Sequence, residues 1–111
     1  MKNHAKDTIN CWLIYANQTE DDILLRKELE SLVADDRIQF RVHYTLDRPP
    51  TDGSWKHSTG FVNVEMCRDH LPKATDPNTM VFLCGPPPMI KFACGPALKE
   101  LDFAEEQTFT F

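Results

Sequence analysis

The chain has 111 residues, of which 41% are hydrophobic and 26% charged, and its formal net charge at pH 7 is −5. This length allows one domain with one modest core. The negative charge and the scattered basic residues argue against a nucleic-acid partner. No apolar stretch approaches the roughly 20 residues of a membrane-spanning helix, and the polar start of the chain is unlike a secretory signal.

The four cysteines are Cys11, Cys67, Cys84 and Cys94, and none has a second cysteine close by in the sequence. No histidine pair has helix spacing either, so a zinc site is disfavoured and we expect no metal. A disulfide scaffold is disfavoured because the apolar content is high and the cysteines are few. We interpret them as reduced thiols, which indicates the cytoplasm or, within a longer protein, the cytoplasmic face of a membrane.

In chain order, the first predicted strand is the apolar run Cys11–Ala16, which is typical of a strand buried on both faces. Thr19 then precedes Asp22 by three residues, a pattern that resembles a capping box. A helix is indicated next by apolar residues at i, i+4, i+7 and i+8. These residues are Leu25, Leu29, Leu32 and Val33. Alternating β-forming residues predict a second strand over residues 40–46.

Prolines and glycines between Arg48 and Gly60 predict a surface loop. Asn63 is a good N-cap for a short helix, which Pro72 would end. A second loop covers residues 73–78.

The third apolar strand is predicted over residues 80–84. A helix follows from about Pro88, with a kink or break at Gly95-Pro96, and resumes to about Leu101. Residues 108–111 alternate like a terminal strand.

Strands that alternate with helices predict an α/β fold with an open, mainly parallel sheet and flanking helices. In open sheets of this kind, ligands bind at the carboxyl ends of the strands. The loops that begin at Asn17, Asp47 and Gly85 are therefore where a site is expected.

The strongest local motif is the segment 84–89, Cys-Gly-Pro-Pro-Pro-Met, directly after the third apolar strand. Gly85 lets a ligand approach the backbone, and the prolines hold a rigid turn before a helix whose N-terminus favours anions. The residues alone support a second interpretation equally well, namely a stiff turn with a buried and inert cysteine. No base is tied to Cys84 by spacing, so a nucleophilic role is not indicated.

Asp47 and Phe61 each allow a ligand-binding and a purely structural interpretation. Asp47 closes the second strand, where a carboxylate can accept hydrogen bonds from a ribose diol and repel a 2′-phosphate. A lone Asp is nevertheless more often a solvated loop acid. Phe61 can stack on an adenine, but from the residues alone a core aromatic is the better interpretation.

Five segments follow one another along the chain in a specific order and spacing. They are LIYANQTEDDILLR (13–26), YTLDRPP (44–50), GFVN (60–63), MCRDHLP (66–72) and CGPPPMI (84–90). Together they resemble the pyridine-nucleotide domain of the NADH-cytochrome b5 reductase family, and the likeness runs from about Lys6 to Phe111. The resemblance implies that residues 1–111 form part of an NAD(H)-binding domain.

The resemblance also implies roles on the adenosine side of an NADH site. Ala16, Asn17 and Gln18 would line it. Asp47 would bind the adenosine ribose and set a preference for NADH over NADPH, and Phe61 would lie against the adenine.

On the nicotinamide side, Cys84, Gly85 and Pro86, followed by Pro87, would hold the nicotinamide and pyrophosphate against FAD. Cys84 would position the ring and not attack it. Phe111 would end the chain near the interface with a flavin domain.

The family also has a flavin-binding barrel and a first strand of the nucleotide domain, and neither is found in this sequence. We expect unpaired sheet edges and self-association as a consequence. Three hypotheses therefore compete. The chain is the NADH-binding part of a flavoenzyme that reduces cytochrome b5 or a similar haem acceptor and is inactive alone; or it is a nucleotide-binding module; or it is a structural or interaction protein.

Overall fold

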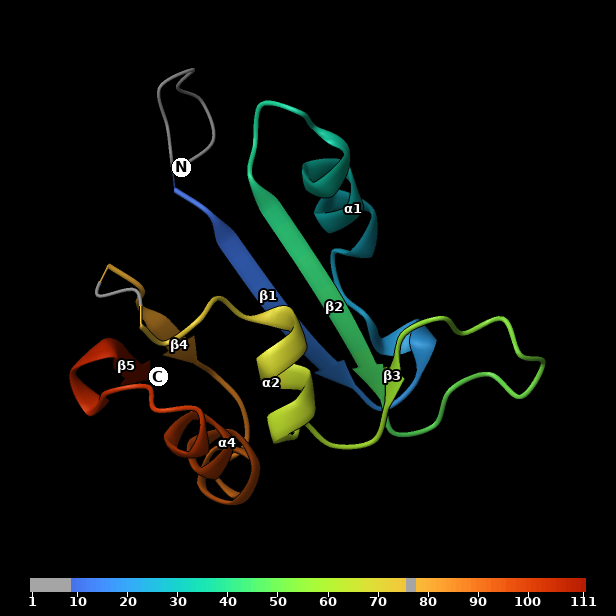
Figure 1. Ribbon diagram of the computed structural model, residues 1–111. Coiled ribbons are helices and arrows are strands. Elements are labelled where there is room, and N and C mark those ends of the chain that lie inside the picture. Colours follow the sequence, from blue (N-terminus) through green and yellow to red (C-terminus); the bar gives the residue numbers. More distant parts are fainter. Residues whose placement is uncertain (1–8, 76–77) are drawn as a thin grey trace. The chain divides into compact units, whose positions relative to one another are not determined.

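The structure is a computed structural model that describes residues 9–75 and 78–111 (Figure 1). The chain divides into two compact units, residues 1–60 and 61–111, and each unit has a sheet of its own. Every strand pair is parallel, in agreement with the predicted α/β fold. Among the described residues, no helix has the length and apolar content needed to cross a bilayer.

The first unit is built on a three-stranded sheet of order β1-β2-β3. β1 (Cys11–Asn17) pairs in parallel with β2 (Phe40–Leu46) along its whole length, and β2 pairs with the short β3 (Ser58–Thr59). The two long strands are those that the apolar run and the alternating segment predict. β3 lies inside the stretch predicted as loop, which is a small correction.

The expectation that the first strand is buried on both faces is wrong for the described structure. Every residue of β1 is partly exposed. Among the described residues β1 pairs only with β2, so its other edge carries no neighbouring strand. The core of this unit instead forms around Ile23, Tyr44 and Leu46, with Tyr15, Val42 and Trp55 packed against them.

The helix α1 (Arg26–Ala34) differs from the helix predicted from the apolar stripe that begins at Leu25. Leu25 lies outside the helix in the left-handed region, with φ of 59°, and none of the helix residues is buried. The capping box is present, but it closes a single 3₁₀ turn over Glu20–Asp22. Ile23 then enters the core, and burying it requires the chain to turn sharply before α1 begins.

The second unit combines two helical segments with a two-stranded sheet. α2 (Val64–His70) begins where expected, because the Asn63 side chain accepts a hydrogen bond of 2.9 Å from the Met66 N–H. β4 (Val81–Leu83) and β5 (Thr108–Thr110) pair in parallel, as predicted for two strands. The buried residues of this unit are Val62, Met66, Cys67, Cys94, Ala97, Leu98 and Phe103.

The helix after β4 begins with α3 (Pro87–Met89), widens to a π-helix over Ile90–Cys94 and ends as α4 (Gly95–Glu100). The predicted kink at Gly95-Pro96 takes this form. Pro96 has no N–H and would crowd the preceding turn of a regular α-helix, and a wider turn relieves both problems. Gly95 donates its N–H to the Ile90 carbonyl, and a Cβ there would lie 3.0 Å from that oxygen.

Candidate functional site

The first candidate site lies where β1 and β2 end, in the first unit. The parallel hydrogen-bond pattern continues beyond both strands: Asp47 N–H donates to the Asn17 carbonyl at 3.1 Å, and Arg48 N–H donates to the Gln18 carbonyl at 2.8 Å. We call Ala16, Asn17, Gln18, Asp47 and Arg48 the β1–β2 rim. The structure thus brings together four of the five residues predicted to hold the adenosine side, and the fifth, Phe61, belongs to the second unit.

Two polar side chains of the β1–β2 rim, those of Asp47 and Asn17, have no hydrogen-bond or ion-pair partner among the described residues. The Asp47 side chain is exposed, and no cation of the described residues pairs with its carboxylate. The Asn17 side-chain nitrogen is buried and finds no acceptor among the described residues. The residues that carry this acceptor and this donor are paired through their backbones, an arrangement that fits a ligand with both hydroxyl and acceptor groups.

A cluster behind the β1–β2 rim keeps the loop after Asp47 in place. The Arg26 guanidinium lies 5.3 Å from the centre of the Tyr44 ring and 5.7 Å from that of Trp55. Its ion pairs with Glu20 at 2.7 Å and Glu30 at 3.0 Å raise the pKa of Arg26, the hydrogen bond to Glu20 contributing most. Burial raises the pKa of Tyr44, so this ring stays neutral at ordinary pH.

Trp55 also donates its indole N–H to the Ser58 carbonyl at 2.8 Å, which ties the loop to β3. The chain then reaches Gly60, whose N–H donates to the Leu46 carbonyl at 2.8 Å and whose carbonyl accepts from the Thr45 hydroxyl at 2.7 Å. Gly60 has φ of 87°, a conformation that glycine adopts without strain.

Phe61 follows as the first residue of the second unit. It is 79% exposed, so the interpretation as a core aromatic is wrong.

The second candidate site lies where β4 and β5 end, in the second unit. Phe111 N–H donates to the Leu83 carbonyl at 2.9 Å, so the final residue extends the pairing of the two strands. We call Cys84, Gly85, Pro86, Pro87 and Phe111 the β4–β5 rim. All five are exposed, which contradicts the interpretation of Cys84 as a buried thiol.

The backbone of the β4–β5 rim is tightly turned. The Pro86 carbonyl accepts from the Met89 N–H at 3.0 Å and from the Ile90 N–H at 3.2 Å, which starts the helix. A Cβ on Gly85 would lie 3.2 Å from the Met89 sulfur, so a larger residue there would displace that side chain. A glycine at this turn leaves its backbone open to a ligand.

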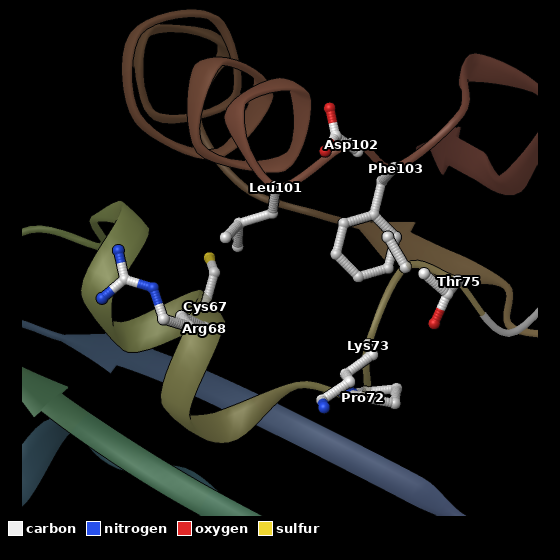
Figure 2. Close-up of a pocket in the computed structure, with 9 residues that line it drawn as sticks. Cys67, Arg68, Pro72, Lys73, Thr75, Leu101, Asp102 and Phe103 are labelled. Carbon is white, nitrogen blue, oxygen red and sulfur yellow. The ribbon is translucent and has the colours of Figure 1, made fainter.

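The second unit also contains a cavity of about 330 Å³ between α2, the segment after it and the end of α4 (Figure 2). Buried Cys67 and Phe103 line it, and the Cys67 thiol points toward Leu101. Burial raises the pKa of Cys67 to about 11, with a smaller contribution from Cys94, so this thiol is protonated at neutral pH. None of the predicted site residues lines this cavity.

Comparison with known proteins addresses which class of ligand such strand ends bind. A family model described as "Oxidoreductase NAD-binding domain" matches residues 1–95. The chain belongs to the oxidoreductase NAD-binding domain family. This NAD-binding domain is also similar to NADH-cytochrome b5 reductase 2 of Gallus gallus, with 50% identity over 96% of the chain and 34% of the relative.

Other relatives agree. NADH-cytochrome b5 reductase 1 of Homo sapiens is 46% identical over 96% of this chain and 34% of its own length. The solved cytochrome b5 reductase domain of Ulva prolifera nitrate reductase matches with 45% identity and a TM-score of 0.87, over 96% of this chain and 39% of that one. The predicted resemblance and the predicted fold class are thus confirmed. The chain spans about a third of the length of the reductases it matches.

Two features of the NAD-binding domain could not be found from sequence spacing. One is the hydrogen bond of 3.1 Å from the Arg48 guanidinium to the Gln18 side chain, whose partners are 30 residues apart. The other is the stack of Arg26 on Tyr44 and Trp55. Both join residues far apart in the sequence that only the tertiary fold brings together.

Proposed function

We propose that this chain is the NADH-binding part of a flavin-dependent oxidoreductase that passes hydride from NADH to FAD and on to cytochrome b5 or a similar one-electron haem acceptor. The observation that carries the proposal is the position of Asp47. Its carboxylate has no cation partner among the described residues, and its backbone is hydrogen-bonded at the carboxyl ends of parallel strands in an NAD-binding domain. The match to reductases named for NADH and cytochrome b5 supports the rest.

In this proposal the β1–β2 rim binds the adenosine half of NADH. Asp47 accepts hydrogen bonds from the ribose hydroxyls and repels a 2′-phosphate. The buried Asn17 amide supplies the donor that now has no acceptor among the described residues. Ala16 and Gln18 line the same rim, and exposed Phe61 offers a ring face to the adenine.

The β4–β5 rim binds the nicotinamide and pyrophosphate half. Gly85, Pro86 and Pro87 present backbone to the ligand, and Cys84 positions the ring. Phe111 lies beside Leu83 and would meet the flavin domain. Bound NADH supplies the hydride and FAD accepts it, while this chain supplies position and charge.

The FAD would be bound by residues outside this chain, since the chain covers about a third of the reductases it matches. We therefore propose that residues 1–111 form a partial NAD(H)-binding domain and that they reduce ferricyanide neither with NADH alone nor with added FAD. Sustained turnover in that mixture would contradict the proposal. We place the protein in the cytoplasm or at the cytoplasmic face of a membrane, where four thiols stay reduced.

The experiment that tests the nucleotide assignment is calorimetric titration of the chain with NADH and NADPH. We expect NADH to bind more tightly, since charge repulsion of about 1 to 2 kcal/mol corresponds to about five- to thirtyfold. Asp47→Ala should remove most of that preference. Asp52→Ala, which removes an exposed acid of the same loop, should leave it intact. Equal binding of both nucleotides by the parent chain would count against the role of Asp47.

A second candidate function is self-association. Among the described residues, β1 and β4 each pair with a strand on one side only, and unpaired edges invite pairing between copies. Size-exclusion chromatography at several concentrations tests this: a concentration-dependent dimer supports it, and a monomer at all concentrations excludes it.

A further inference from the structure

Gln18 and Arg48 are joined by two hydrogen bonds at the β1–β2 rim. The Arg48 N–H donates to the Gln18 carbonyl at 2.8 Å, and the Arg48 guanidinium donates to the Gln18 side-chain oxygen at 3.1 Å. Both side chains are exposed. The second bond fixes the direction of a long and flexible cation at the residue next to Asp47.

We propose that Gln18 is a specificity-determining residue, because it holds the Arg48 guanidinium and leaves Asp47 as the charge that meets the adenosine ribose. This inference rests on the proposed function, since it assumes a dinucleotide at the β1–β2 rim. A free Arg48 would oppose Asp47, because a guanidinium binds phosphate through paired hydrogen bonds. The pairing with Gln18 therefore favours NADH over NADPH.

Two neighbouring acids already have partners other than Arg48. The Asp22 carboxylate accepts hydrogen bonds from the backbone N–H and the hydroxyl of Thr19, at 3.0 and 2.8 Å. Glu20 is paired with Arg26 at 2.7 Å. Asp47 and Arg48 are thus the charges at this rim that a 2′-phosphate would meet, and Gln18 sets the balance between them.

If the Arg48 side chain is released from Gln18, the affinity for NADPH relative to NADH rises whichever way that side chain moves. A guanidinium that swings toward the ribose attracts the 2′-phosphate directly. One that pairs with Asp47 cancels the carboxylate charge that repels it. Both movements raise the affinity for NADPH relative to NADH, by about three- to tenfold for the loss of one exposed hydrogen bond to a charged group.

The test is a titration of the 111-residue chain and its variants with NADH and NADPH. Gln18→Leu keeps most of the side-chain volume and removes the acceptor, so we expect the NADPH-to-NADH affinity ratio to rise about three- to tenfold. Gln18→Glu holds Arg48 with an ion pair and should lower the ratio. In an Arg48→Ala background, Gln18→Leu should leave the ratio unchanged, because there is no guanidinium to release.

A ratio that does not move in Gln18→Leu, in a chain that binds NADH, overturns the inference and leaves the proposed function standing. A parent chain that binds neither nucleotide overturns the proposed function. The restraint of the Arg48 side chain by Gln18 is then tested without nucleotide, by measuring the mobility of the Arg48 Nε–H through ¹⁵N relaxation. Equal mobility in the parent chain and in Gln18→Leu overturns the inference, and greater mobility in the variant supports the restraint.

Discussion

The Asp47 backbone N–H, one residue beyond the end of β2, donates a hydrogen bond of 3.1 Å to the carbonyl of Asn17, the last residue of β1. This bond holds the backbone of Asp47, whose carboxylate is exposed, beside that of Asn17, whose buried side-chain nitrogen finds no acceptor among the described residues. The backbone of both residues is positioned by strand pairing. A site supported in this way needs little rearrangement to bind a ligand.

The exposure of Cys84 predicts that a ligand at the β4–β5 rim protects this thiol. Cys84 is exposed, whereas Cys67 and Cys94 are buried, so N-ethylmaleimide should label Cys84 well before the other two. Saturating NADH should slow labelling of Cys84 about tenfold or more, as measured by mass spectrometry of tryptic peptides. ADP-ribose, which has no nicotinamide, is the matched control and should protect it little. Equal labelling with and without NADH would remove Cys84 from the proposed site.

We predict that a side chain at Gly60 lowers the stability of the fold because of the backbone conformation there. Nothing lies within 4 Å of a Cβ built there, so crowding is not the cause, but φ is 87°. Gly60→Ala should lower the free energy of unfolding by about 1 to 2 kcal/mol in urea titrations. Gly60→Asn is the control and should lose less, because Asn tolerates positive φ. An alanine variant as stable as the parent would contradict the strained turn.

The Asn63 cap offers a local test of α2. Its side chain accepts from the Met66 N–H at 2.9 Å, so Asn63→Ala should lower the unfolding free energy by about 1 kcal/mol. Asn63→Asp keeps an acceptor at the same place and should retain most of the stability. If the alanine and aspartate variants melt at the same temperature, the cap does not contribute.

The raised pKa of Cys67 predicts a loss of stability in base. Its pKa is raised from 9.0 to about 11 in the folded chain, mainly by burial. Between these two values the unfolded chain has lost a proton that the folded chain keeps, so the unfolding free energy should fall with rising pH, by about 2 kcal/mol over the window. Cys67→Ser should reduce this slope in urea titrations, and part of it should remain because burial also raises the pKa of Cys94. Cys84→Ser, at an exposed thiol, should have the parent's slope; an unchanged slope in Cys67→Ser would count against the shift.

Much of the framework follows from the sequence because it depends on local patterns. The apolar run from Cys11 and the alternation from Phe40 predict β1 and β2, and Asn63 predicts the start of α2. The start of α1 was mispredicted because the periodicity of the leucines is local, while the burial of Ile23 against Tyr44 depends on the whole unit.

In the candidate site, too, some features follow from local sequence patterns and others depend on the tertiary fold. Asp47 and Cys84 are predictable as candidates, because Asp47 directly follows the alternating second strand and Cys84 is the last residue of the third predicted strand. The pairing of Gln18 with Arg48 depends on the register of two strands, which no spacing rule encodes. The Gly95-Pro96 pair likewise predicts that the helix is interrupted. It does not predict that the interruption takes the form of a π-helix.

The anchoring of Trp55 bears on how this loop can change through evolution. Trp55 packs under Arg26 and donates to the Ser58 carbonyl, while residues 51–54 ahead of it are exposed. We expect mutations that lengthen or shorten this tip to leave the Trp55 anchor undisturbed. The tip is therefore where homologous chains can differ in length, and it is also the natural place to insert an affinity tag or a fluorescent label.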